Sequence, residues 1–202
     1  HDLTYFAGER TQEARPVSDL YQVILELPRP CFAAINGICL AGGAGIALST
    51  DIRLMAEGAR LGWPQVKRGV SSVSGPFLLA NLVPRNIAYE ILFTGEFLSA
   101  ERALELGLVN RVVPHDELMA ECERVAKKIC LLPQLGVKLT KAAINRSLES
   151  MGFLNAVNHN LELMTIFDTS TSPEQEEFNA ISTEKGLRAA LDWRDARFKE
   201  LE

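Results

Sequence analysis

The sequence of 202 residues has only three histidines, four cysteines and no excess of positive charge. Its 21 lysines and arginines face 26 aspartates and glutamates, which gives a formal net charge of −5. Because nucleic-acid binding depends on neutralising many phosphates with basic side chains, this balance argues against a nucleic-acid partner. The longest apolar stretch, residues 31–48, is broken by Asn36 and several glycines, and no signal-peptide pattern is visible. We therefore expect no membrane segment and a cytoplasmic location.

The four cysteines show no spacing that is typical of a metal or redox site. Cys31, Cys39, Cys122 and Cys130 form no CxxC pair, and no histidine cluster accompanies them. No metal ligand set is therefore predicted. All four lie in apolar sequence contexts, which predicts buried thiols in a reducing compartment.

Strand and helix patterns alternate up to about residue 132 and give way to helical patterns after it. This order predicts an α/β domain over residues 1–132 and a helical region over residues 133–202. Strands or extended segments are expected at residues 31–35, 51–56, 60–66 and 108–113. Helices are expected at residues 17–27, 76–82, 86–93, 136–150 and 153–168, from Ser99, along the face Leu118 to Ile129, from Pro173, and over residues 184–202.

The glycine-rich stretch Ala41-Gly42-Gly43-Ala44-Gly45 is the candidate site of chemistry. Adjacent glycines before a helix can present free N–H groups to an anion, although a tight packing turn would use the same residues. The stretch also partly matches a dinucleotide fingerprint. The next strand arrives too soon for a parallel crossover, however, and this argues against a nicotinamide-dependent oxidoreductase.

Residues 30–43 read Pro-Cys-Phe-Ala-Ala-Ile-Asn-Gly-Ile-Cys-Leu-Ala-Gly-Gly, which resembles the signature of the crotonase superfamily, that of enoyl-CoA hydratase/isomerase. Three downstream segments agree in order: Asp51-Ile52-Arg53, residues 93–103 and residues 107–113. The resemblance covers most of residues 1–135. It implies a crotonase-like ββα spiral core, N-terminally incomplete, over residues 1–132, and a C-terminal helical oligomerisation region that builds a homotrimer or hexamer.

The resemblance also implies a mechanism for an acyl-CoA thioester, with coenzyme A as part of the substrate and no other cofactor. Two backbone N–H groups polarise the thioester carbonyl in an oxyanion hole, and one such donor is typically worth about 3–4 kcal/mol. By motif position Gly42 is the second donor. The first donor lies just upstream of a Gly-x-Asp-Leu element whose end matches Asp2-Leu3, so it is expected to precede His1. Substrate contacts are expected at His1, Asp2, Leu3, Leu40, Ala41, Gly43, Gly45, Trp63 and Ser72.

The chain departs from the hydratase pattern at both glutamates that handle water. The first position is Gly45, and the second is Gln65 within Gly62-Trp63-Pro64-Gln65. An amide can orient a water or a substrate, but it cannot accept a proton at neutral pH. The ordinary two-glutamate hydration is therefore doubtful, and restoring Gly45→Glu and Gln65→Glu should raise it if only the carboxylates are missing.

Other candidate groups have a structural alternative. Ser71, a catalytic candidate with Gly42 and Gln65, and Ser72 could bind substrate or water, or could satisfy backbone groups in a turn. Trp63 could line the acyl pocket or pack in the core. Arg194 and Arg197 on the last helix could meet coenzyme A.

The resemblance predicts an acyl-CoA-processing enzyme, a lyase or isomerase of the enoyl-CoA hydratase/isomerase family in fatty acid metabolism. The sequence leaves its reaction open between hydration and another reaction of the same enolate, such as isomerisation, decarboxylation or hydrolysis. The loss of both glutamates leaves open a second class of function, a non-catalytic acyl-CoA-binding subunit of the same fold.

Overall fold

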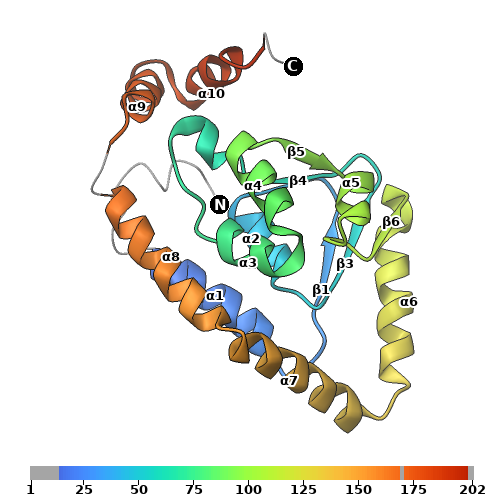
Figure 1. Cartoon of the computed structure of the whole chain (residues 1–202). Coiled ribbons are helices and arrows are strands. Elements are labelled where there is room, and N and C mark those ends of the chain that lie inside the picture. The colour runs from blue at the N-terminus through green and yellow to red at the C-terminus, as the bar shows by residue number, and fades with distance from the viewer. Residues whose placement is uncertain (1–13, 169–170, 200–202) are drawn as a thin grey trace.

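The computed structural model describes residues 14–168 and 171–199, and these form a spiral of short strands wrapped by helices (Figure 1). The strands of these residues form two three-stranded sheets. The first contains β1 (Phe32–Ile35), β3 (Ile52–Ala56) and β6 (Arg111–Val113), all parallel. The second contains β2 (Ile38–Leu40), β4 (Arg60–Gly62) and β5 (Phe97–Ser99), with β5 antiparallel.

Each of the first two turns of the spiral adds one strand to each sheet and then a helical segment, whereas in the third turn α5 (Ala100–Glu105) lies between β5 and β6. The first turn is β1, β2 and α2 (Gly42–Leu48), and the second is β3, β4, the 3-10 helix η2 (Pro64–Arg68), α3 (Gly75–Leu82) and α4 (Arg85–Thr94). This ββα order is that of the fold expected from the sequence. The remaining helices are α1 (Ala14–Glu26), η3 (His115–Glu117), α6 (Leu118–Cys130), α7 (Gln134–Ser150), α8 (Phe153–Asp168), α9 (Pro173–Lys185) and α10 (Leu187–Ala196).

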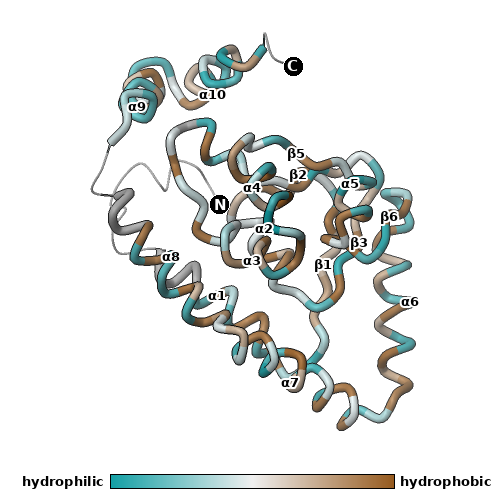
Figure 2. Tube along the Cα trace, in the orientation of Figure 1, coloured by the Kyte–Doolittle hydropathy of each residue, from teal (hydrophilic) through white to brown (hydrophobic). Residues whose placement is uncertain are grey.

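The core lies where β3 runs between β1 and β6. Leu54, Met55 and Ala56 of β3 are fully buried, as expected for a parallel strand that is covered on both faces. Helix α3 closes the core through Phe77, which meets Phe153 of α8 edge to face at 5.5 Å between ring centroids. Figure 2 shows apolar residues concentrated along β1, β3 and α3, whereas α9 carries long hydrophilic stretches.

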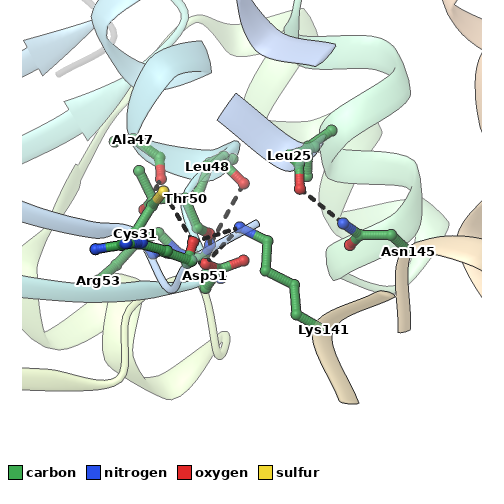
Figure 3. A network of polar contacts seen from close by, with 10 residues as sticks. Leu25, Cys31, Ala47, Leu48, Thr50, Asp51, Arg53, Lys141 and Asn145 are labelled. Carbon is green, nitrogen blue, oxygen red and sulfur yellow. Dashed lines mark hydrogen bonds and ion pairs between the residues drawn. The ribbon is translucent and has the colours of Figure 1, made fainter. Parts of the chain in front are cut away.

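Arg53 explains the Asp51-Ile52-Arg53 motif in structural terms. Its buried guanidinium donates to the carbonyl oxygens of Leu108 and Thr50, at 2.6 Å each, and of Leu48 at 3.3 Å. Figure 3 shows this cluster at the junction between α2 and β3. These hydrogen bonds join the end of α2, the start of β3 and the segment before β6, so the motif stabilises the spiral.

Helix α7 is tied to the rest of the molecule by two polar side chains, Lys141 and Asn145. Lys141 Nζ lies 2.8 Å from Asp51 Oδ2 and 3.1 Å from the Arg29 carbonyl oxygen, and Asp51 Oδ2 also accepts the Cys31 N–H (Figure 3). The Asn145 side chain donates to the Leu25 carbonyl at the end of α1, at 2.6 Å. The helical region therefore begins with a helix that is fastened to the spiral.

Several local expectations are confirmed, and others are wrong. Ser99 and Ser172 each cap a helix by accepting an N–H three residues on. The final helix expected over residues 184–202 is wrong, because Gly186, with φ 85°, separates α9 from α10. The extended segment 60–66 ends as a strand at Gly62, since Pro64 starts η2. The three-residue strands β2 and β5 were too short to predict.

The expectation of four buried thiols is also wrong. Cys122 is buried, Cys31 and Cys39 are partly buried, and Cys130, the last residue of α6, is exposed. In the part of the chain that the structure describes, no helix combines the length and the apolar character that crossing a membrane requires.

Candidate functional site

The candidate site begins where β2 and β4 end side by side. These strands are parallel, and Leu40, the last residue of β2, is in register with Gly62, the last residue of β4. The Ala41 N–H then donates to the Gly62 carbonyl oxygen at 2.9 Å. Because parallel strands end at one edge of a sheet, the chain places Gly42 and Gln65 beyond the same edge. The pairing thus brings together two candidate positions that are 23 residues apart in the sequence.

Gly62 itself has to be small at this edge. A Cβ atom on Gly62 would lie 3.1 Å from the Glu96 carbonyl oxygen and 3.2 Å from the Phe97 ring. Its antiparallel partner in β5 is Phe97. The glycine of the Gly62-Trp63-Pro64-Gln65 segment therefore allows β5 to approach β4 closely.

Ala41 has an unusual backbone conformation directly before Gly42. Its φ of 53° and ψ of −115° match the first central position of a type II′ turn, which glycine normally occupies. Among the described residues it is the only non-glycine residue with positive φ. Such a conformation costs on the order of 1–3 kcal/mol and occurs preferentially at functional sites. Because ψ sets the orientation of the following peptide, the strained Ala41 fixes the direction of the Gly42 N–H.

The amides that follow this turn precede the hydrogen bonds of α2. The first intrahelical bond joins the Gly45 N–H to the Ala41 carbonyl at 3.0 Å, so the N–H groups of Gly42, Gly43 and Ala44 come before it. Gly43 is exposed, and the nearest atom to a Cβ built on it is Cys39 Sγ at 4.0 Å. The expected oxyanion donor, Gly42, is partly buried and directly precedes this exposed glycine.

Gly45 lies one helical turn further on, in a fully occupied environment. A Cβ atom on Gly45 would lie 2.7 Å from each of three atoms: Cβ and Oγ of Ser74, and Cζ of Tyr21. Contacts below 3 Å essentially never occur for real Cβ atoms. The first glutamate position of the hydratase pattern is therefore filled by Tyr21 of α1 and by Ser74 from the loop before α3.

Tyr21, Ser74 and Trp63 form a buried polar group around this position. The Trp63 Nε1–H donates to Ser74 Oγ at 3.2 Å, and Tyr21 lies beside this bond, with its Cζ as close to a Cβ on Gly45 as Ser74 Oγ is. Burial raises the pKa of Tyr21, and the neighbouring Ser74 side chain partly offsets that rise. Trp63 is 1% exposed and belongs to the core, so it does not form an open pocket wall. No sequence motif could have revealed Tyr21, because only tertiary packing brings α1 against α2.

Gln65 occupies the second glutamate position, at the start of η2. Its backbone carbonyl accepts the Val70 N–H at 3.1 Å, which fixes the turn after β4. Its side-chain Oε1 is buried and has no hydrogen-bond partner among the described residues. A buried acceptor without a partner costs free energy, about 1–3 kcal/mol. This oxygen is therefore suited to accept a hydrogen bond from a bound molecule.

The serine loop before α3 divides into an exposed and a buried part. Ser71 is exposed, whereas Ser72 is buried and its Oγ accepts the Gly75 N–H at 2.9 Å. Asn160 of α8 holds the same loop by donating to the carbonyl oxygens of Ser72 and Val73. The structure thus gives Ser72 a capping role, and leaves Ser71 accessible.

The two arginines of α10 lie in different surroundings. Arg194 pairs with the adjacent Asp195 at 2.6 Å and is largely buried. Arg197 lies over the Trp193 ring and faces a hollow of about 220 Å³ beside η2, lined by Val66, Lys67, Gly69, Glu174, Arg197 and Phe198. Only Arg197 therefore borders a hollow next to the Gln65 segment. His1, Asp2 and Leu3 lie outside the described residues.

Comparison with known proteins places the chain in a family. The sequence profile described as "Enoyl-CoA hydratase/isomerase" matches residues 2–200. A short-chain-enoyl-CoA hydratase from Clostridium acetobutylicum is 41% identical over 124 residues, which cover 61% of this chain and 48% of that protein. A crotonyl-CoA hydratase from Syntrophomonas wolfei is 31% identical over 206 residues, covering 98% of this chain and 74% of the relative.

Solved structures give the same result for the fold. An enoyl-CoA hydratase/isomerase from Xanthobacter autotrophicus Py2 superposes with a TM-score of 0.86 at 39% identity, over 92% of this chain and 68% of that one. A monofunctional enoyl CoA isomerase from M. smegmatis superposes with a TM-score of 0.61 at 29% identity, over 66% of this chain and 63% of that one. The chain spans about half the length of the Clostridium relative, 48%.

Proposed function

The chain belongs to the enoyl-CoA hydratase/isomerase family, and from this premise we propose that it processes an acyl-CoA thioester through an enolate held at the Gly42 N–H. The proposal concerns the whole protein, whose first oxyanion donor is expected upstream of His1. It needs no cofactor other than the coenzyme A of the substrate. The reaction is one that requires no pair of glutamates, such as a double-bond shift or another reaction of the same enolate.

The observation that carries this proposal is the strained turn at Ala41. A positive φ at a non-glycine residue is unfavourable, and the register of β2 with β4 and the Ala41–Gly62 hydrogen bond hold it in place. The free energy spent on this conformation has a functional reason if the Gly42 N–H must point at a thioester oxygen. A packing turn alone would be more stable with glycine at position 41.

The test is proton exchange at the carbon next to the thioester carbonyl. The full-length protein should bind butyryl-CoA and catalyse exchange of its alpha protons in deuterated water, as followed by NMR, because enolate formation requires loss of that proton. Crotonyl-CoA hydration, followed by absorbance, is the parallel assay. Absence of any butyryl-CoA binding by the full-length protein would contradict the proposal.

A non-catalytic acyl-CoA-binding subunit is the second candidate, and the environment of Gly45 favours it. Neither glutamate position carries a carboxylate, and the first is filled by Tyr21 and Ser74. A subunit of this kind would bind butyryl-CoA with no alpha-proton exchange. The exchange assay therefore separates the two functions.

We also propose that the protein is a homo-oligomer, a trimer or hexamer, that associates through its C-terminal helices. Large apolar side chains of α7 and of the segment before it are exposed: Leu131, Leu135, Leu139 and Ile144 are each at least 58% exposed. Burying them in a contact between copies would remove this surface from water. Light scattering of Leu135→Asp/Leu139→Asp should report a smaller assembly than the parent protein, and an unchanged mass would contradict the proposal.

A further inference from the structure

The space around Gly45 bears on which reaction the proposed site can perform. A hydratase needs at this position both a carboxylate and room for the water that it handles. Here a Cβ atom, the first atom of any side chain, would already overlap three atoms of Tyr21 and Ser74. Gly45 is itself buried, and Tyr21 is 1% exposed. A side chain at this position, and therefore a carboxylate, has no room while Tyr21 and Ser74 stay where they are.

Tyr21 is held in this place from two sides. On one side the tyrosine ring packs against Phe77 of α3, with ring centroids 6.3 Å apart. On the other, it lies beside Ser74, since Tyr21 Cζ and Ser74 Oγ would both be 2.7 Å from a Cβ atom on Gly45, and Ser74 Oγ accepts the Trp63 Nε1–H. The ring therefore cannot move away from Gly45 without losing a packed aromatic contact in the core.

Tyr21, Ser74 and Trp63 lie close to the residue that is expected to bind the thioester oxygen, Gly42. Residues three apart lie on the same side of a helix, about 4.5 Å apart along its axis. Gly42 and Gly45 have this spacing in α2. Tyr21 thus fills the volume one turn from the proposed oxyanion donor, where an attacking water would otherwise be activated.

We infer that Tyr21 is a specificity-determining residue: packed beside Ser74 and Trp63, it excludes the carboxylate and the water of a hydratase from position 45, so that a thioester bound at the Gly42 N–H is not hydrated. This inference rests on the proposed function for its consequence. Its steric part, the filling of position 45, can be measured without any substrate.

The steric part is tested by a mutant cycle on thermal unfolding. Gly45→Ala should lower the unfolding temperature by about 2–12 °C, because overpacking of a core costs about 1–3 kcal/mol and a chain of this size loses about 2–4 °C per kcal/mol. In the background Tyr21→Leu/Ser74→Gly, which removes the overlapping atoms, the same substitution should cost little. Gly136→Ala is the matched control, since a Cβ there meets nothing within 4 Å. An equal cost of Gly45→Ala in both backgrounds would overturn the inference.

The chemical part is tested with crotonyl-CoA and butyryl-CoA. The parent protein should exchange the alpha protons of butyryl-CoA at least tenfold faster than it hydrates crotonyl-CoA. Gly45→Glu alone should give no gain in hydration, whereas Gly45→Glu/Tyr21→Leu/Ser74→Gly should hydrate at least tenfold faster than Gly45→Glu, a factor equal to about 1.4 kcal/mol in the barrier.

Two results would overturn the chemical part. One is a rate of crotonyl-CoA hydration by the parent protein that equals its rate of butyryl-CoA exchange. The other is a gain in hydration rate for Gly45→Glu alone as large as that for Gly45→Glu/Tyr21→Leu/Ser74→Gly. If the opened variant does not fold, the ratio of exchange to hydration in the parent protein still decides. Failure of the proposed function is recognised separately, because the parent protein would then bind no butyryl-CoA, or bind it without alpha-proton exchange, while the unfolding cycle still reports on Tyr21.

Discussion

The Nζ atom of Lys141 lies 2.8 Å from Oδ2 of Asp51, 90 positions earlier in the chain. The contact joins α7 to the start of β3, and Asp51 Oδ2 also accepts the Cys31 N–H at the start of β1. One carboxylate oxygen thus connects the helical region to both strands of the first parallel pair. The Lys141 side chain is only 10% exposed, which limits screening by solvent.

Lys141→Met should lower the free energy of unfolding by about 1–3 kcal/mol, because it leaves Asp51 with one donor fewer and the Arg29 carbonyl without this partner. Urea unfolding measures the change. Lys127→Met is the control, since Lys127 makes an exposed pair with Glu123 and such pairs contribute about 0–1 kcal/mol. Equal losses of unfolding free energy in the two variants would show that the Lys141 contact contributes no more than an exposed ion pair.

Of the two substitutions that restore a glutamate, Gln65→Glu should disturb the structure less, because the glutamine already occupies the space that a glutamate side chain needs. In the background Tyr21→Leu/Ser74→Gly, which frees the volume around Gly45, the new carboxylate should raise crotonyl-CoA hydration up to about tenfold by supplying one base. The gain should increase with pH as the carboxyl ionises. Gln175→Glu, at a second buried glutamine whose Oε1 has no partner among the described residues, should give no gain.

Ala41→Gly should keep or raise stability, by up to about 1 kcal/mol, because glycine adopts a φ of 53° without strain. The freer turn should at the same time slow alpha-proton exchange, since the Gly42 N–H is less firmly oriented. Ala143→Gly, on the exposed face of α7, is the control, because glycine in a regular helix should lower the free energy of unfolding by about 0.5–1 kcal/mol. A clear loss of stability in Ala41→Gly would contradict the role of strain at this turn.

Glu121 should make stability depend on pH. Hydrogen bonds from Arg124, and then the contacts with Arg111, lower its pKa from the ordinary 4.5 to about 2. Because the folded-state pKa lies below the unfolded one, the stabilisation is complete above pH 4.5 and is lost as the pH falls from 4.5 towards 2.

Glu121→Gln should therefore reduce stability at neutral pH and flatten its pH dependence between 4.5 and 2. Urea unfolding at neutral pH and at about pH 3 checks this expectation. Glu123→Gln removes a more exposed carboxylate from the same helix and serves as the comparison. If Glu121→Gln and the parent protein lose stability in parallel over this range, the ion pair does not set the pH dependence.

Much of the fold could be predicted from the sequence, because it depends on local patterns. Pro30, Asn36 and Gly37 bound the apolar run that becomes β1, and Ser99 and Ser172 cap helices through contacts three residues away. Where elements are short or broken by a single glycine, as at β2, β5 and Gly186, the periodic signal was too weak or the break too local to detect.

By itself, the sequence determined the family, the Gly42 turn and the absence of a carboxylate at positions 45 and 65, since each can be read from consecutive residues. Only the tertiary structure decided what fills the first of these positions. Tyr21 and Ser74 are 24 and 29 residues away from Gly45 in the chain, and they reach it because α1 and the loop before α3 both pack against α2. Gly45 therefore marks an occupied volume, and no pattern of consecutive residues encodes a contact of this kind.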